Sequence, residues 1–229
     1  MVHSNIIELE ISGQSAMFTD PESGGSFPVP TFEAVKGILR AVYWKPTFIW
    51  VPDELRVMNR ISMEDYSVMR RGKCVVQRRL ADIRWQVRAH FVWNDNRPEF
   101  ARDRDEDKHF RIALRSLARG GRFPVWLGTA DCPGEVRPAR FGSSGGYYDG
   151  SGAVDFGVMY HGVNYPDEGW NEFTRTTVSR RKWHCVMNDG VIRFLPPEKC
   201  SAEFVRTACA KRFNSTDTEV GACAAGKQD

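Results

Sequence analysis

The chain has 229 residues, 41% of them hydrophobic, and is therefore long enough to bury a core as one large domain or as two small ones. Its 32 lysines and arginines are nearly balanced by 29 aspartates and glutamates, which leaves a formal net charge of +3. No apolar run approaches the roughly 20 residues that a membrane-spanning helix needs, which excludes a chain threaded through a membrane by helices.

The distribution of charge along the chain is more informative than its sum. Acidic residues gather between Asp103 and Asp107, whereas the charged residues of the segment from Arg78 to His90 are all basic except Asp82. A local basic surface on a nearly neutral protein is compatible with nucleic-acid binding, although a solvated sheet face would give the same pattern.

The six cysteines include no Cys-x-x-Cys pair and no spacing typical of a zinc site. We therefore expect reduced thiols, and neither a bound metal nor a cofactor. The segment from Ile6 to Ile11 does not resemble a signal peptide, because Glu8 and Glu10 interrupt it, so we expect a cytoplasmic protein.

The first predicted elements are a strand and a helix. Apolar and polar residues alternate from Ile7 to Ile11, as in a strand with one buried face. A loop from Ser12 to Pro30 leads to a helix that begins after Thr31, a residue type favoured at the N-cap. The apolar stripe of this helix comprises Phe32, Val35, Leu39 and Val42. Gly37 inside it costs about 1 kcal/mol relative to alanine, so we expect close approach of backbone or RNA there. Pro46 ends the helix.

The middle of the chain predicts two more strands and a second helix. Phe48 to Val51 reads as a strand, and Ile83 to Trp93 is the clearest strand in the sequence. Its period of two separates an apolar face from a cationic one that carries Arg84, Gln86, Arg88 and His90. A helix opens at Asp107-Lys108-His109-Phe110, has apolar positions that include Leu114, and is closed by Gly120-Gly121.

Phe123 to Leu127 is a further strand, and the resulting order β-α-β-β-α-β is typical of a ferredoxin-like fold, an antiparallel sheet backed by two helices. Past residue 131 we expect a small antiparallel β-sheet with strands at Val154–Tyr160, Thr174–Val178 and Trp183–Met187. The predicted fold class is therefore α+β. Its divisions are a ferredoxin-like domain over residues 1–130, a β-rich domain over 131–213, and a disordered tail over 214–229.

Three side chains from two distant segments have the chemistry that RNA cleavage needs. RNA can be cut without a metal when its own 2′-hydroxyl attacks the phosphate. This requires a group that takes the 2′ proton, a cation for the developing charge and an acid for the leaving oxygen. Histidine, with a pKa of about 6.5, suits either proton role. Lysine suits the charge, and tyrosine can orient or exchange a proton. Tyr43, Lys108 and His109 supply this set if the two helices lie on one face of the sheet. The alternative is a Lys-His pair without a catalytic role.

Other candidates are weaker. The Asp-x-Asp-x-Asp pattern from 103 to 107 begins like a calcium loop, but Lys108 replaces the required glycine and Leu114 the closing glutamate. His161 and His184 fall in strand-like segments, where we expect structural histidines.

The run from Gly25 through Pro46 resembles the CRISPR-associated protein family five, in its subtype I-C (Dvulg) branch, above all in Pro28-Val29-Pro30-Thr31 and Ala41-Val42-Tyr43-Trp44-Lys45-Pro46. The helix at Asp107-Lys108-His109 and the segment Arg119-Gly120-Gly121-Arg122 look like the second helix and the glycine-rich turn of the same family. The match spans most of residues 1–200. The resemblance implies a ferredoxin-like (RNA-recognition-like) domain of the RAMP superfamily, followed by a small β-sheet domain.

The resemblance also implies a function. It predicts an endoribonuclease that cuts precursor CRISPR RNA within the repeat, at the base of the hairpin, without a metal, and leaves a 2′,3′-cyclic phosphate and a 5′-hydroxyl. The protein then stays bound to the 5′ handle of the mature crRNA in the interference complex (Cascade), beside its backbone and large subunits. The catalytic tyrosine, lysine and histidine of the branch fall on Tyr43, Lys108 and His109. The alternative is a non-catalytic RNA-binding subunit that holds the 5′ handle.

An A-form hairpin is recognised through its shape, its phosphates and its unpaired flanking bases. We therefore expect phosphate contacts from cations and base stacking from Trp44 and Phe27. The expected cations are Lys36, Arg40, Lys45, Arg84 and Arg88. We also expect weak binding of duplex DNA by the basic face, but no DNA cleavage, since no carboxylate cluster suits a metal.

Overall fold

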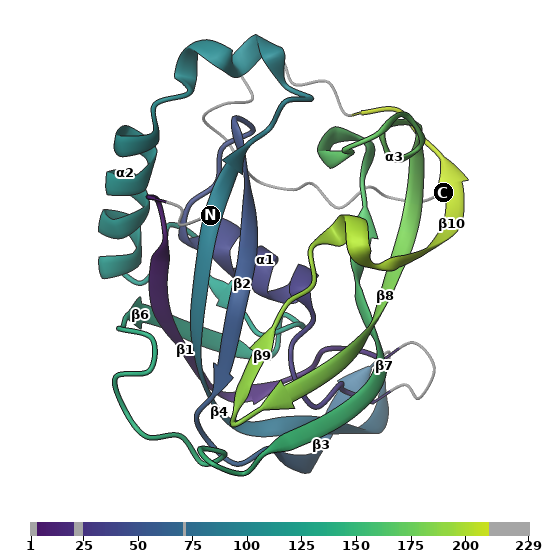
Figure 1. Ribbon diagram of the computed structural model, residues 1–229. Coiled ribbons are helices and arrows are strands. Elements are labelled where there is room, and N and C mark those ends of the chain that lie inside the picture. Colours follow the sequence, from purple (N-terminus) through teal and green to yellow (C-terminus); the bar gives the residue numbers. More distant parts are fainter. Residues whose placement is uncertain (1–3, 21–24, 71, 211–229) are drawn as a thin grey trace.

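An antiparallel sheet of ten strands organises the part of the chain that the computed structural model describes, residues 4–20, 25–70 and 72–210 (Figure 1). The chain is thus an α+β protein, as the sequence predicts. The strands are β1 (Ile7–Ala16), β2 (Phe48–Val57), β3 (Ser62–Arg70), β4 (Lys73–Trp93), β5 (Val125–Trp126), β6 (Pro133–Pro138), β7 (Ala153–Asn164), β8 (Thr177–Asn188), β9 (Val191–Arg193) and β10 (Ser201–Thr207). The α-helices are α1 (Phe32–Val42), α2 (Glu106–Ala118) and α3 (Glu172–Thr176).

Strand β4 holds the sheet together, because it pairs with β1, β2 and β3. The period of two is confirmed in its second half, where Trp85, Val87, Ala89 and Phe91 are all buried. The strand is longer than expected. It begins at Lys73 because its first half forms a hairpin with β3, a strand that the sequence analysis did not predict.

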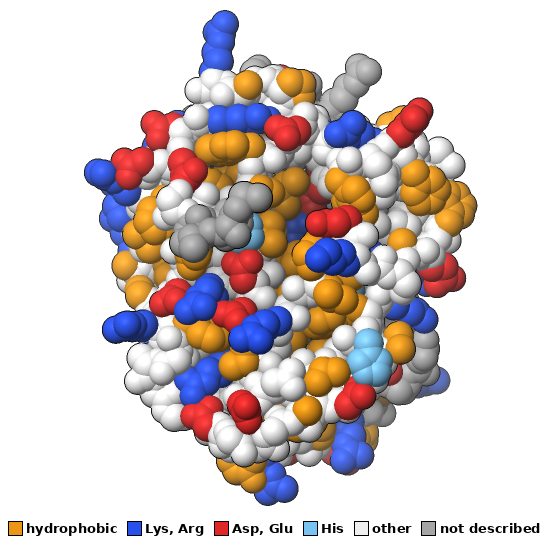
Figure 2. Space-filling model, viewed as in Figure 1, with side chains coloured by type: hydrophobic (Ala, Val, Ile, Leu, Met, Phe, Trp, Pro, Cys, Tyr) orange, Lys and Arg blue, Asp and Glu red, His pale blue; other side chains and the backbone are white. Residues whose placement is uncertain are grey.

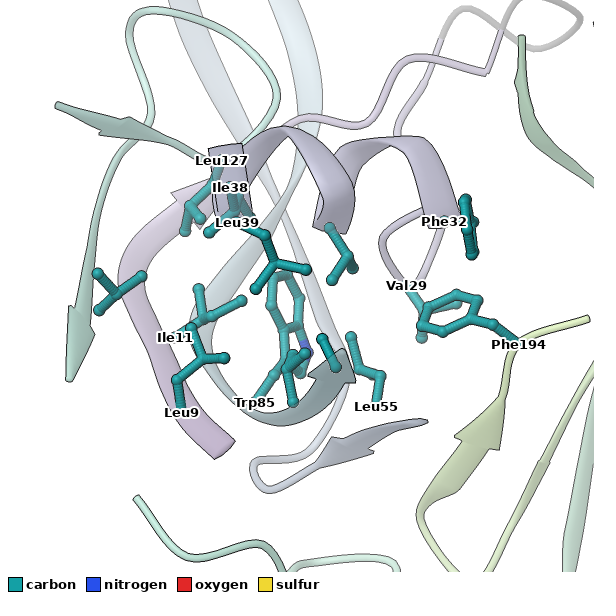
Figure 3. Packing of buried hydrophobic residues seen from close by; sticks show 14 of the residues in the cluster. Leu9, Ile11, Val29, Phe32, Ile38, Leu39, Leu55, Trp85, Leu127 and Phe194 are labelled. Carbon is teal, nitrogen blue, oxygen red and sulfur yellow. The ribbon is translucent and has the colours of Figure 1, made fainter. Parts of the chain in front are cut away.

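Helix α1 packs on the apolar face of β4. Its predicted N-cap is confirmed, because the Thr31 hydroxyl accepts a hydrogen bond of 3.1 Å from the Ala34 amide. Figure 3 shows Leu39 of α1 above Trp85 of β4, with Leu55 of β2 nearby. Apart from the neighbouring residues and the backbone of α1 itself, no described atom lies within 4 Å of where a Cβ on Gly37 would stand, so the expected close approach of another backbone segment is not found there.

Helix α2 covers the same face of the sheet further along, since its His109 ring lies 6.5 Å from the ring of Phe91. The side chain of Asp105 caps the helix by accepting a bond of 3.0 Å from the Lys108 amide. Leu114 is exposed, contrary to the predicted apolar stripe. The glycine turn after α2 is confirmed, with φ of 101° at Gly121. This turn is tied to α1, because the amides of the next two residues both donate to the Ala41 carbonyl at 3.0 Å.

The rest of the sheet departs from the expected layout in two places. The position next to β1 is taken by β6, and the predicted strand from Phe123 to Leu127 is reduced to β5, which pairs with β6. The predicted strand from Thr174 to Val178 is wrong in its first half, because a capping box at Asn171 starts the short helix α3 there. Strands β7 and β8 confirm the other two strands expected in this region.

The second half of the chain continues the same sheet, since β9 pairs with β2 and β6 with β1. A domain boundary at residue 130 stays a prediction, and the predicted disordered tail over 214–229 lies outside the described residues. Among the helices of the described ranges, none has the length and apolar character needed to span a membrane.

Candidate active site

Tyr43 and His109 meet although 66 residues separate them in sequence. The Tyr43 hydroxyl lies 2.7 Å from Nδ1 of His109. Tyr43 immediately follows α1 and has an extended backbone, and its carbonyl accepts a bond of 2.7 Å from the Trp50 indole. His109 stands in the first turn of α2. The two helix ends on one sheet face therefore bring the predicted pair together.

The surroundings of His109 fix which of its nitrogens carries the proton. Nε2 lies 2.7 Å from the backbone carbonyl of Asp103, and a carbonyl oxygen can only accept a hydrogen bond. In the neutral ring Nε2 is therefore the donor, and Nδ1 accepts the hydrogen of the Tyr43 hydroxyl. The histidine is thus oriented to receive a proton from the tyrosine.

Asp103 links the third predicted residue to this pair. Its carboxylate accepts a bond of 2.5 Å from Lys108 Nζ and one of 2.9 Å from the Thr47 hydroxyl, and it lies 3.4 Å from Nε2 of His109. Partial burial works to raise the pKa of Asp103, but the bonds from Lys108 and Thr47 outweigh it and lower that pKa below its usual value. The carboxylate is therefore ionised at neutral pH. The sequence alone does not point to this residue, because the Asp-x-Asp-x-Asp pattern around Asp103 resembles only a calcium loop, which Lys108 and Leu114 rule out.

The three predicted catalytic side chains differ in their access to solvent. Tyr43 is 1% exposed and His109 is 0% exposed, whereas the Lys108 side chain is 49% exposed. Burial is the main cause that raises the pKa of Tyr43 to about 12; Arg122 acts to lower it and Asp103 to raise it. Tyr43 is therefore a neutral phenol at physiological pH. In the described conformation the Lys108 side chain is therefore open to a ligand at the surface, whereas the Tyr43 side chain is closed off from it.

Arg122 is, after Asp103, a second residue of the site to which the sequence alone assigns no role. Its guanidinium lies over the Tyr43 ring, 4.5 Å from the ring centre, and its Nε donates to the Ser116 hydroxyl at 3.2 Å. Arg122 follows the Gly120-Gly121 turn, so the contact between that turn and α1 brings it here. The Arg-Gly-Gly-Arg segment of the sequence indicates a turn at this point, but it does not indicate that Arg122 contacts Tyr43.

The predicted RNA contacts on α1 and after it have unequal access. Lys36 is 3% exposed and is ion-paired with Glu168, so its side chain points into the protein. Arg40 is partly exposed; it also pairs with Glu168, at 2.9 Å, and lies over the Trp44 ring. Trp44 and the neighbouring Lys45 are partly exposed. Arg40, Trp44 and Lys45 therefore remain accessible at the end of α1, whereas Lys36 does not.

Arg84 and Arg88 do not lie with the predicted catalytic residues. They alternate with Trp85 and Phe91 along β4 and so belong to the opposite face of the sheet. Arg84 pairs with Glu10 at 3.1 Å, and Arg88 pairs with carboxylates of β1 and β2. Figure 2 shows basic and acidic side chains interspersed over this face. The expected net cationic face is therefore neutralised by the neighbouring strands.

The two strand histidines have protein partners. His161 is buried, its Nε2 lies 2.9 Å from the Leu195 carbonyl, and Arg181 donates to its Nδ1 at 3.1 Å. Burial, together with the charge of Arg181, lowers the pKa of His161 to about 3. His184 lies 2.9 Å from the Asp155 carboxylate at the surface. Both geometries fit the structural role that the sequence predicts.

Comparison with known proteins gives four relevant matches. The family described as CRISPR-associated protein (Cas_Cas5), in its Cas5d form, matches residues 6–195. A stretch of 64 residues is 42% identical to the CRISPR pre-crRNA endoribonuclease Cas5d of Mannheimia succiniciproducens and spans 27% of this chain and 28% of that protein. A crystal structure titled only as a CRISPR-associated protein is 33% identical, covers 86% of this chain and 96% of its own, and has a TM-score of 0.76. SMU1763c of Streptococcus mutans, described as functionally uncharacterized, has the same identity and coverage and a TM-score of 0.74.

Proposed function

Since this chain belongs to the Cas5d family of CRISPR-associated proteins, whose match spans residues 6–195, we propose that it is an endoribonuclease that processes precursor CRISPR RNA. The observation that carries the proposal is the 2.7 Å contact between the Tyr43 hydroxyl and Nδ1 of His109, with Lys108 adjacent. The name of the Mannheimia relative supports the same activity, although the aligned stretch is 28% of that protein.

In the proposed reaction, the 2′-oxygen attacks the neighbouring phosphorus within the repeat, at the base of the hairpin. A bond from the 2′-oxygen to phosphorus forms and the bond from phosphorus to the 5′-oxygen breaks, giving a 2′,3′-cyclic phosphate and a 5′-hydroxyl. Tyr43 accepts the proton of the 2′-hydroxyl while the proton of the Tyr43 hydroxyl moves to Nδ1 of His109. The Asp103 carboxylate stabilises the resulting imidazolium. Lys108 neutralises the phosphate and donates a proton to the leaving oxygen. No step needs a metal.

The proposal extends to the assembly. The product stays bound through its 5′ handle in the interference complex, in the cytoplasm, beside the backbone and large subunits. The strand order β2–β4–β1, with α1 and α2 on one face, supports a ferredoxin-like first domain in this role.

The second candidate function is a non-catalytic subunit that holds the 5′ handle. The observation in its favour is the burial of Tyr43 and His109, because a catalytic tyrosine has to reach the substrate. A binder needs only the exposed Lys108 and its neighbours.

Cleavage of a labelled repeat hairpin in excess EDTA separates the two. The matched control is the same hairpin with a 2′-deoxy substitution at the nucleotide before the cut. The proposed enzyme cuts the first RNA and not the second. Binding of both hairpins without a cut would contradict the endoribonuclease and favour the handle-holding subunit. A cut that EDTA abolishes would contradict the metal-free mechanism.

A further inference from the structure

A cationic pocket lies at the C-terminal end of α2, next to the candidate active site. It has a volume of about 390 Å³ and is lined by Ile112, Arg115, Ser116, Arg119, Gly121 and Arg122. Three of its six lining residues are arginines. Arg115 and Arg119 stand four residues apart and so lie on one side of the helix end, where like charges repel in the absence of an anion.

These arginines differ from the others in their partners. Among the residues that the structure describes, no carboxylate lies within ion-pair distance of Arg115, Arg119 or Arg122. On the opposite sheet face, by contrast, Arg84 and Arg88 are each neutralised by glutamates. Cations at a helix C-terminus also interact favourably with the helix dipole, which by itself would explain one or two of them. It does not explain why three converge on a pocket.

The pocket is linked to the tyrosine of the site through one of its arginines. Arg122, which lines it, lies over the Tyr43 ring at 4.5 Å. Gly121, also in the lining, is held against α1 so closely that a Cβ there would lie 3.3 Å from the Ala41 carbonyl oxygen. The pocket therefore adjoins the candidate active site on the side of Tyr43.

We infer that Arg115, Arg119 and Arg122 bind backbone phosphates of the RNA strand that enters the candidate active site. Guanidinium groups suit this ligand, because their planar arrangement of donors matches two phosphate oxygens at once. The three arginines place positive charge on the side of the protein where Tyr43, Lys108 and His109 lie. The opposite face, along β4, offers no such charge, because its arginines are paired with glutamates. This inference rests on the proposed function for the identity of the strand.

The test is the salt dependence of binding to the 2′-deoxy repeat hairpin, which binds but is not cut. The variant is Arg115→Gln with Arg119→Gln. The matched control is Arg111→Gln, which alters an exposed arginine of the same helix that pairs with Asp107 at 2.9 Å. The double variant is expected to bind more weakly and to reduce the slope of log K against log salt by about 1.4, or 0.7 for each lost single-strand contact. The control keeps the slope of the unmodified protein.

An unchanged slope in the double variant would overturn the inference, and so would lost thermal stability with an unchanged slope, since that marks a role in the helix alone. An equal loss of affinity for duplex DNA of the repeat sequence would also overturn it, because the pocket would then bind any polyanion. The proposed function has a separate readout. If the unmodified protein fails to cut RNA but its binding depends on the two arginines, catalysis is refuted and the pocket stands. Normal cleavage with an unchanged slope refutes the pocket alone.

Discussion

Asp103→Asn tests whether the carboxylate supports the proton transfer from Tyr43 to His109. The change keeps the side-chain shape and removes its charge. The attraction between the Asp103 carboxylate and a protonated His109 ring, 3.4 Å apart, is about 5 kcal/mol at an effective dielectric of 20. The Asp103 side chain is 32% exposed, so water screens much of this energy. We expect a remaining effect of about 1.4–2.7 kcal/mol on the barrier, a loss of about 10–100-fold in cleavage rate.

The assay is single-turnover cleavage of the repeat hairpin, with the affinity for the 2′-deoxy hairpin measured in parallel. A positioning role predicts a slower cleavage step with little change in affinity. A merely structural role would instead weaken cleavage and binding together. Asp107→Asn is the matched control, because its carboxylate lies in the first turn of α2 and pairs with the exposed Arg111. Cleavage by Asp103→Asn at the rate of the unmodified protein would refute the reasoning.

Three further predictions concern stability. Glu168→Gln is expected to lower the free energy of unfolding, measured in urea, by about 3–5 kcal/mol, because the variant leaves the buried Lys36 with only the more distant carboxylate of Glu33, at 3.9 Å; a loss below 1 kcal/mol would contradict the assigned pair. Gly37→Ala is expected to raise the free energy of unfolding by about 1 kcal/mol, because the added Cβ meets no described atom within 4 Å apart from the neighbouring residues and the backbone of α1 itself; a destabilised variant would contradict this. The raised pKa of Tyr43, about 12, predicts stability that is present below pH 10, the ordinary tyrosine value, and is lost as the pH rises toward 12. Tyr43→Phe should lose less stability over that range, and identical pH profiles for the two proteins would refute it.

The sheet was predictable where one strand carries a clean local pattern. The alternation from Trp85 to Phe91 was sufficient to predict β4 and its buried face. Strand β3 has no such pattern, because neither of its faces is buried along its length and Met69 is largely exposed. The short helix α3 depends on the capping box at Asn171, which competes with a segment whose residues favour strands.

The candidate site was predictable only in part. The chemistry of Tyr43, Lys108 and His109 and the family resemblance both point to these three residues, but their meeting depends on how α1 and α2 pack. Asp103 and Arg122 were missed because each acts through a neighbour that is distant in the sequence or lies across a turn.

The expected RNA contacts illustrate the same limit. The burial of Lys36 depends on Glu168, which lies 132 residues away, and no local pattern signals that ion pair. The neutralisation of Arg84 likewise depends on the register between β1 and β4, which brings Glu10 opposite the neighbouring Gln86. Pairings set by strand register and helix packing are not encoded in any single segment.

The most direct test of the central claim is the single-turnover cleavage rate of Tyr43→Phe. This variant keeps the ring beneath Arg122 and removes only the hydroxyl that meets His109. The account predicts that cleavage of the repeat hairpin falls at least about 100-fold, as expected for loss of a group that transfers a proton, while affinity for the 2′-deoxy hairpin is retained. Cleavage at the unmodified rate would contradict the proton transfer through Tyr43 and His109.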